Sequence, residues 1–132
     1  MSINTTVNWT TKAFKDLSID ELYAILRLRS EVFVVEQNCV FLDIDNNDQI
    51  AYHTMGWLGK ELVASTRLYD KDQSYTGYQS IGRVVSAPQY RREGFGKDLM
   101  QYSIQECKRL FGKGPIKIGA QKYLLKFYSS FG

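Results

Sequence analysis

The sequence has little cysteine, little proline and no long apolar run, and each scarcity excludes a class of protein. Two cysteines, Cys39 and Cys107, in 132 residues are too few for a disulfide-rich secreted scaffold and lack the spacing of a metal site. Residues 1–11 are polar, and nowhere do about 18 apolar residues follow one another, so neither a signal peptide nor a membrane span is indicated. We therefore expect reduced thiols, a cytoplasmic location, no bound metal and no membrane partner.

The chain is also poor in linker-like sequence and in excess charge. No repeat, low-complexity stretch or Pro/Gly-rich linker interrupts it, so residues 1–132 are expected to form a single domain. A formal net charge of +3 is mild, and the Lys and Arg residues are spread along the chain, so no nucleic-acid partner is expected. RNA binding through basic residues and tyrosines is a weaker alternative, because most aromatic residues fall on predicted core positions.

Apolar periodicity and turn residues predict a strand, a helix, three strands, a helix, a strand and a last short helix. Ser18 and Glu21 have the spacing of a capping box, which starts a helix that continues to about residue 34. Gly59 and Lys60 separate two strand-like runs and predict an antiparallel hairpin. The predicted strands are residues 7–14, 50–58, 61–69, 78–86 and 116–120, the other helices 96–111 and 123–130, and an Asp- and Asn-rich loop spans 38–48. This order indicates an α/β (α+β) fold with helices packed on a mixed sheet.

Residues 91–96 form a glycine-containing loop between a predicted strand and a predicted helix. The first N–H groups of a helix are unpaired, and the helix dipole favours an anion there. Glycine at positions 94 and 96 lets phosphate oxygens approach those N–H groups. The loop lacks the Gly-Lys-Ser/Thr of a Walker loop, and Leu99 replaces the third glycine of the dinucleotide fingerprint. It therefore predicts either an anion site of another type or a tight turn that only needs a positive φ.

The surrounding sequence favours the anion site. The chain reads SIGRVVS at 80–86 and YRREGFG at 90–96, and this order resembles the central motif of the GNAT N-acetyltransferase superfamily. Arg91, Gly94 and Gly96 match the family pattern Gln/Arg-x-x-Gly-x-Gly/Ala. The strings LRSEVFVVEQNC at 28–39 and DIDNND at 43–48, followed by a histidine, resemble the ElaA-type branch of the family. The resemblance covers nearly the whole chain and implies a mostly antiparallel central sheet flanked by helices.

The resemblance implies acetyl-CoA as co-substrate and assigns residues to it. The strand before the loop would contact the pantetheine arm through its backbone. The backbone N–H groups of the loop would bind the pyrophosphate, so side-chain identity matters little there. The implied cofactor-binding residues are Val84, Val85, Arg91, Arg92, Glu93, Gly94, Phe95, Gly96 and Lys97.

The resemblance also implies direct transfer of the acetyl group to an amine, without a covalent enzyme intermediate. Tyr128 is the candidate general acid, because a tyrosine hydroxyl can protonate a departing thiolate. The backbone N–H of Val85 is the implied oxyanion donor. The candidate base is Glu36, His53 or a water relay. The alternative interpretations are that Glu36 is a solvated or capping carboxylate and that His53 has a structural role.

Three further expectations concern charge, completeness and partners. Arg67 and Arg83 lie in predicted strands, where they either pair at the surface or anchor an anionic group. The family normally continues beyond the position of Gly132 with a further strand pair, so we expect the C-terminal strands to be missing or supplied by a partner chain, and a homodimer stays open. The acceptor is a small-molecule or peptide amine whose identity no motif encodes. A catalytically silent CoA-binding or protein-interaction module is the alternative function.

Overall fold

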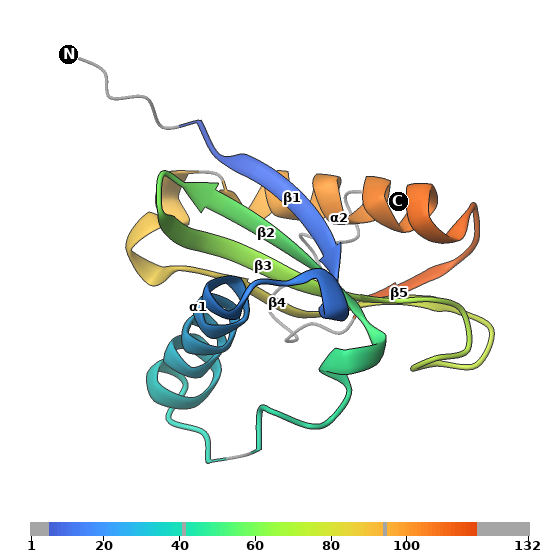
Figure 1. The fold of residues 1–132 in the computed structure, drawn as a ribbon, viewed down its shortest axis with the longest axis horizontal. Helices are drawn as coiled ribbons and strands as arrows, with labels where there is room; N and C mark the ends of the chain where they lie inside the picture. The colour runs from blue at the N-terminus through green and yellow to red at the C-terminus, as the bar shows by residue number, and fades with distance from the viewer. Residues whose placement is uncertain (1–5, 41, 94, 119–132) are drawn as a thin grey trace.

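A five-stranded sheet runs through the centre of the molecule, with a long helix on each face (Figure 1). The computed structural model describes residues 6–40, 42–93 and 95–118, and for residues 91–93 it describes the backbone alone. β1 to β4 are antiparallel neighbours, and β5 joins β4 in parallel. The strands are β1 (Asn8–Ala13), β2 (Tyr52–Leu58), β3 (Glu61–Tyr69), β4 (Gln79–Ser86) and β5 (Ile116–Ile118). The prediction of a mixed, mostly antiparallel sheet flanked by helices is confirmed.

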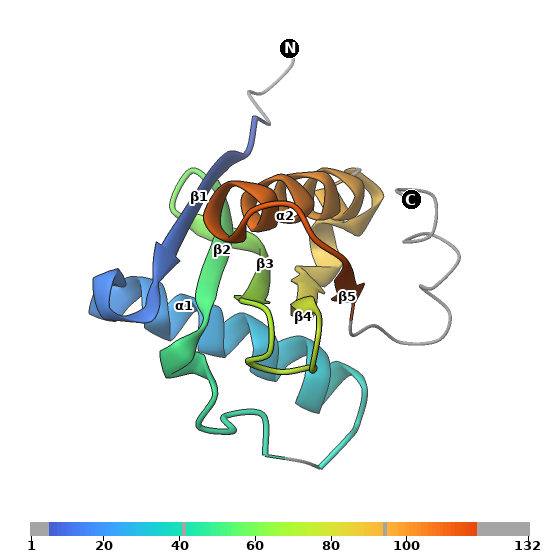
Figure 2. The same cartoon turned by 90° about the vertical axis from the view of Figure 1, so that its right-hand side faces the viewer.

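The two faces of the sheet carry separate apolar layers. α1 (Ile19–Arg29) continues into a π-helical segment (Ser30–Glu36) and covers one face, while α2 (Phe95–Phe111) covers the other (Figure 2). The layer on the α1 side includes Ile25, Leu28, Val63 and Val85, and the layer on the α2 side includes Leu68, Ile81, Met100 and Cys107. None of the helices within the described ranges combines the length and the apolar character needed to cross a membrane.

The predicted capping box begins α1. The Oγ of Ser18 accepts a hydrogen bond from the N–H of Glu21 at 3.0 Å, and the Glu21 carboxylate accepts one from the N–H of Ser18 at 2.8 Å. The predicted helix to about residue 34 is confirmed in extent, but its form changes, because the α-helical part ends at Arg29 and the chain continues as a π-helix to Glu36. Apolar periodicity does not separate these forms over so few residues, since both keep Val32 on the buried side.

Most predicted strand boundaries are confirmed within two residues. β3 has the predicted bounds, and the β2–β3 turn contains Gly59 at φ +63°, which suits glycine. β2 begins later than predicted, because Asp48–Ile50 forms a 3-10 turn before it. The helix predicted at residues 123–130 lies outside the described residues.

The segment predicted as a loop at residues 91–96 is largely helical. Pro88–Glu93 forms a 3-10 helix, and α2 begins at Phe95. Pro88 suits the first position of a helical turn, since it has no N–H to leave unpaired. The N–H of Tyr90 donates to the carbonyl of Ala87 at 3.0 Å. The connection between β4 and α2 is therefore a tightly bonded turn rather than an extended loop.

Candidate active site

The middle of β4 contains a bulge. Ser65 of β3 lies opposite Val85, but Arg67 lies opposite Gly82. The single β3 residue between them therefore faces two β4 residues, Arg83 and Val84, and Arg83 has a φ of +48°. A bulge bends its strand and increases the local twist. The second half of β4 thus runs in a different direction from the first half.

β5 pairs only with the first half of β4 in the part of the chain that is described. The parallel partners are Gln79 with Ile116, Ser80 with Lys117 and Ile81 with Ile118. All three pairs precede the bulge. Within the described ranges, β4 residues 82–86 are bonded to β3 and have no strand partner on their other side. This uncovered backbone contains both valines that the sequence assigned to the pantetheine arm.

Val84 and Val85 turn their side chains to opposite faces of the sheet. Val85 is buried in the layer beneath α1, and Val84 packs against the layer beneath α2. The N–H of Ala87 donates to the carbonyl of Val63 in the same register that pairs Ser65 with Val85. Because successive residues of a strand turn their backbone groups to opposite sides, the N–H and C=O of Val85 face Ser65 of β3, and those of Val84 face away from β3. The structure is therefore compatible with the predicted backbone role of Val84, whereas the backbone groups of Val85 face β3; binding by either residue stays a prediction.

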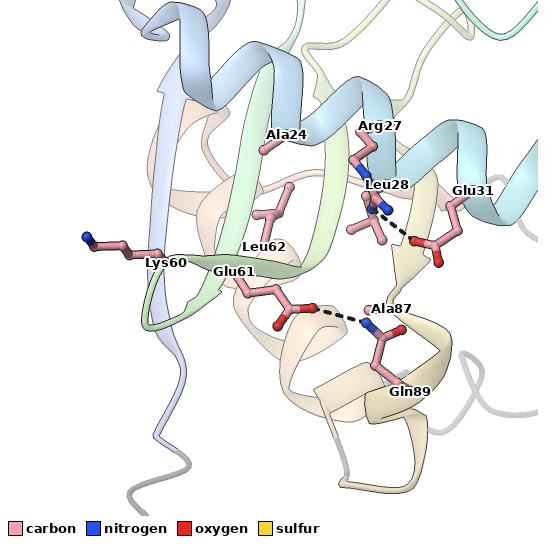
Figure 3. A pocket seen from close by; sticks show the side chains of 9 residues that line it. All are labelled: Ala24, Arg27, Leu28, Glu31, Lys60, Glu61, Leu62, Ala87 and Gln89. Carbon is pink, nitrogen blue, oxygen red and sulfur yellow. Dashed lines mark hydrogen bonds and ion pairs between the residues drawn. The ribbon is translucent and has the colours of Figure 1, made fainter.

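The turn after β4 is fixed to the start of β3 by Glu61. The carboxylate of Glu61 accepts a hydrogen bond from Nε2 of Gln89 at 3.0 Å and one from the hydroxyl of Tyr90 at 2.9 Å. Figure 3 shows Glu61 and Gln89 pointing toward one another across this turn. The N–H of Ala87 also donates to the carbonyl of Val63 at 2.7 Å. Sequence reasoning missed Glu61, because its partners Gln89 and Tyr90 lie 28 and 29 positions further along the chain.

The N-terminus of α2 has room for an anion. Phe95 is buried and contacts the ring of Tyr90, with 6.2 Å between the ring centroids, which anchors the first turn. A Cβ atom on Gly96 would meet nothing within 4 Å, and the backbone there does not require glycine. The first N–H groups of α2 are those that lack a helical partner. The space beside Gly96 is thus open, as an anion at this helix start would require, while Gly94 lies outside the described residues.

Three arginines and three aspartates form a closed ring of ion pairs beside the bulge. Arg29 of α1 contacts Asp43 at 3.0 Å and Asp48 at 2.8 Å. Arg67 of β3 contacts Asp48 and Asp45, each at 2.9 Å. Arg83 contacts Asp45 at 3.2 Å and Asp43 at 2.9 Å, which closes the circle. We refer to these six residues, Arg29, Arg67, Arg83, Asp43, Asp45 and Asp48, as the arginine–aspartate ring.

The ring is electrically neutral and mostly buried. Burial by itself would raise the pKa of Asp45, but the hydrogen bonds from Arg67 and from the N–H of Asn47 lower it to about 2. Burial also opposes ionisation of Asp48, and hydrogen bonds from Arg29 and Arg67 lower its pKa below the usual value. Burial would lower the pKa of Arg67, yet its contacts with the two aspartates raise it. Each charge therefore depends on its neighbours in the ring.

The ring gives the predicted anion-anchoring arginines a specific partner. Arg67 and Arg83 do bind anionic groups, but these groups are aspartates of the same chain. Among the described residues, no three His, Cys, Asp or Glu side chains are grouped so as to hold a metal ion. The sequence signal that could have indicated the arginine–aspartate ring was the Asp-x-Asp-x-x-Asp spacing in a polar loop, together with Arg29 on the buried stripe of a helix.

His53 is buried beside the ring. It is 1% exposed, and its Nε2–H donates to the carbonyl of Asp48 at 2.9 Å. Its ring also lies near Phe14, with 6.3 Å between centroids. Burial is the main cause that lowers the pKa of His53, and it outweighs the opposing effect of Asp48. A neutral, enclosed imidazole bonded to the loop favours the structural interpretation of His53 over a role as base.

The other predicted catalytic residues are placed only in part. Glu36 is exposed at the end of the π-helical segment. Tyr128 lies outside the described residues, as do the side chains of Arg91, Arg92 and Glu93. Lys97 is exposed in the first turn of α2. The structure brings together the bulge, the turn and the start of α2, but it leaves the catalytic acid and base as predictions.

A hollow of about 190 Å³ lies between α1, the start of β3 and the turn after β4 (Figure 3). Ala24, Leu28 and Leu62 contribute apolar lining. Four of its polar groups already bind in pairs, since Arg27 pairs with Glu31 at 3.3 Å and Glu61 binds Gln89, and Lys60 also lines it. The hollow borders the predicted cofactor turn without offering a charge of one sign to a ligand.

Comparison with known proteins identifies the same family. The acetyltransferase (GNAT) domain profile matches residues 34–132. Protein ElaA of Escherichia coli (strain K12) is 39% identical over 128 residues, which cover 96% of this chain and 83% of ElaA. The crystal structure of Escherichia coli ElaA matches with a TM-score of 0.90 over 96% of this chain and 86% of that chain. An acyl-CoA N-acyltransferase from Pseudomonas aeruginosa matches with a TM-score of 0.87 at 40% identity, over 95% of this chain and 85% of that chain.

The fold, the bulged β4 and the turn into α2 thus belong to an acyltransferase, and the chain is a member of the GNAT family. Within that family it is of the ElaA type, because identity and fold agree over nearly its whole length. The assignment made from the motifs is confirmed.

Breaking the ring should be costly. We expect Arg29→Met to lower the free energy of unfolding by roughly 3–5 kcal/mol, because two buried carboxylates lose a partner. Arg27→Met is the matched control, since Arg27 is an exposed arginine of the same helix and its pair should contribute less than about 1 kcal/mol. Urea denaturation of the wild type and both variants measures this. Equal stabilities of the two variants would contradict the importance of the ring.

Asp45 should make the free energy of unfolding depend on pH. Its pKa is about 2 in the folded protein, below the usual 3.8, so its contribution is complete above the unfolded value and is lost as the pH falls toward 2. We expect the wild type to lose about 2 kcal/mol from this group between pH 4 and pH 2. In Asp45→Asn, unfolding free energies measured across this range should fall less steeply. Parallel curves for the two proteins would show that Asp45 is not the cause.

Proposed function

We propose that this protein is an acetyl-CoA-dependent N-acyltransferase, which moves an acetyl group from the CoA thioester to an amine. The observation that carries the proposal is the sequence of a β4 bulge that no other described strand covers, a bonded turn and an α2 N-terminus with open space beside Gly96. The Pseudomonas aeruginosa relative, described as an acyl-CoA N-acyltransferase, supports the same reaction class at 40% identity. Membership of the GNAT family supports a CoA-linked substrate.

The cofactor would be held mainly by backbone groups. We propose that the N–H groups of residues 92–97 bind the pyrophosphate, because the start of a helix attracts an anion. The pantetheine arm would lie along Val84 and Val85, whose side chains pack on the two apolar layers, and would bind the backbone groups of Val84 that face away from β3. Arg91, Arg92, Glu93, Gly94, Phe95, Gly96 and Lys97 complete the proposed set. Glu61 would support this site by holding Gln89 and Tyr90.

The proposed chemistry is direct aminolysis of the thioester. The neutral amine forms the new N–C bond as the C–S bond breaks, the thiolate gains a proton and the amine nitrogen loses one. The N–H of Val84 would stabilise negative charge on the carbonyl oxygen during attack. It replaces the Val85 N–H expected from the sequence, because the N–H of Val85 faces β3. Tyr128 is proposed as the acid that protonates the thiolate.

The proton from the amine has two proposed destinations. Glu36 is exposed at the end of the π-helical segment, where a carboxylate can exchange protons with water. A water relay is the other proposal. His53 is the weakest of the three original candidates, because its Nε2–H is committed to the carbonyl of Asp48 and the ring is buried.

Calorimetry and thiol release separate the proposed enzyme from a silent CoA-binding module. We expect acetyl-CoA to bind and free thiol to appear when suitable primary amines are added. The panel should contain small amines, peptide N-termini and lysine side chains, because the acceptor class is open. Binding without release for every amine would favour the silent module, and the absence of binding at millimolar acetyl-CoA would reject both.

Gly96 offers a variant that separates binding from folding. Gly96→Leu should fill the open space beside the start of α2 and weaken acetyl-CoA binding at least about tenfold. Its thermal midpoint should not fall, since leucine favours helices more than glycine does. Calorimetry and thermal unfolding measure the two effects. Gln101→Leu, on the exposed side of the same helix, is the control, and equal affinities for the two variants would place the phosphate elsewhere.

Tyr128→Phe tests the proposed acid. It should reduce kcat about 100-fold, because proton transfer to the leaving thiolate is lost, and leave acetyl-CoA affinity within about twofold of wild type. The assay uses the amine that gives the fastest thiol release. Tyr123→Phe removes a tyrosine hydroxyl from the same part of the chain and should retain activity. An unchanged kcat in Tyr128→Phe would remove this residue from the mechanism.

A further inference from the structure

The arginine–aspartate ring meets β4 at its most unusual residue. Four non-glycine residues in the described ranges have a positive φ: Asn38, Asn46, Asp72 and Arg83. Asparagine and aspartate tolerate this conformation, because their short polar side chains bond locally, whereas a long side chain such as arginine gains no such bond. Arg83 therefore needs another source of stabilisation for its φ of +48°.

The contacts of the Arg83 guanidinium supply that stabilisation. Its Nε lies 2.9 Å from Oδ1 of Asp43, and its Nη2 donates to the carbonyl of Asp43 at 3.1 Å and to Oδ2 of Asp45 at 3.2 Å. All three contacts come from one short loop. The position of the loop therefore sets where the Arg83 side chain, and with it the bulge, can lie.

The loop is in turn fixed by two other elements of the fold. Arg29 of α1 binds both a carboxylate oxygen and the carbonyl of Asp43, each at 3.0 Å. Arg67 of β3 binds Asp45 through two nitrogens, at 2.9 and 3.0 Å. Because Arg29 is 1% exposed and Arg67 is 5% exposed, neither can move far without breaking buried pairs.

The opposite side of the bulge is also held. Thr66 is the β3 residue between the two registers, and its Oγ1 bonds Thr54 at 2.6 Å and Ser103 of α2 at 2.8 Å. On the α2 side, the bulge is thus fixed by the hydroxyl groups that bond Thr66. On the side of the aspartate loop, it is fixed by the arginine–aspartate ring. Arg83 directly precedes Val84 and Val85, so its backbone angles set the direction of the N–H groups that follow.

We propose that the arginine–aspartate ring is a positioning device for the acyl group: it holds Arg83 in the bulge so that the N–H of Val84, which faces away from β3, points at the thioester carbonyl. Arg83, Asp43 and Asp45 are then positioning residues that act through the β4 backbone. This inference rests on the proposed function, because it assumes that the acyl thioester lies against β4. It adds a link between the aspartate loop and the acyl-binding strand.

Comparing two ligands isolates the carbonyl contact without any acceptor amine. Acetyl-CoA carries the thioester carbonyl and CoA does not, while both carry the pyrophosphate. Calorimetry should show that the wild type binds acetyl-CoA about fivefold more tightly than CoA, the effect of one hydrogen bond. In Arg83→Ala this ratio should fall to about one, with CoA affinity changed less than about twofold.

Two further variants keep this test decisive. Arg83→Gly loses the same ion pairs, but glycine takes up a positive φ freely, so it should keep more of the preference than Arg83→Ala. Arg109→Ala breaks an ion pair of 2.7 Å at the far end of α2 and should keep the full ratio. A ring with only a structural role would weaken both ligands equally in Arg83→Ala, and that result would overturn the proposal, as would a wild-type ratio of one.

Hydrogen exchange measures the bulge independently of the cofactor. The amides of residues 82–86 should exchange about tenfold faster in Arg83→Ala than in the wild type, and they should be unchanged in Arg109→Ala. Unchanged exchange in Arg83→Ala would mean that the ring does not hold the bulge. If the wild type bound neither acetyl-CoA nor CoA, the proposed function would fail, while the exchange rates would still decide whether the ring fixes β4.

Discussion

Mutual neutralisation of three arginines and three aspartates is the interaction on which the arrangement of the site depends. Taking an isolated charge out of water is strongly unfavourable, and a buried ion pair is tolerated only when its geometry satisfies both partners. Here every carboxylate of the ring faces two guanidinium groups. The aspartate loop can therefore close over the sheet without leaving a charge unmatched. It brings α1, β3 and β4 into one electrostatic unit.

The two ends of the proposed cofactor site are held in different ways. At the pyrophosphate end, the turn after β4 is fixed by backbone bonds and by Glu61, and the helix start supplies N–H groups. At the acyl end, the bulge at Arg83 is fixed by side chains that come from distant parts of the chain. The first end thus depends on local backbone geometry, whereas the second depends on the packing of the whole sheet.

Local patterns predicted most of the elements because their causes are local. The capping box of Ser18 and Glu21 and the Gly59 turn both act over a few residues, and both are confirmed. The π-helical continuation at residues 30–36 was missed, since the same apolar spacing fits either helix type. Residues 91–96 were predicted as a loop, because glycine at 94 and 96 suggested irregular backbone, whereas Pro88–Glu93 forms a 3-10 helix.

The sequence by itself determined the family, the order of strands and helices up to β5 and the segment between β4 and α2, because these follow from short motifs and from periodicity. Only the tertiary structure decided the partners of Arg83. Asp43 lies 40 positions away from it, and a spacing of charges does not say which charges meet. It also decided that His53 is buried and bonded to Asp48. The reason is physical: burial and pairing arise when distant strands pack, and no stretch of chain contains them alone.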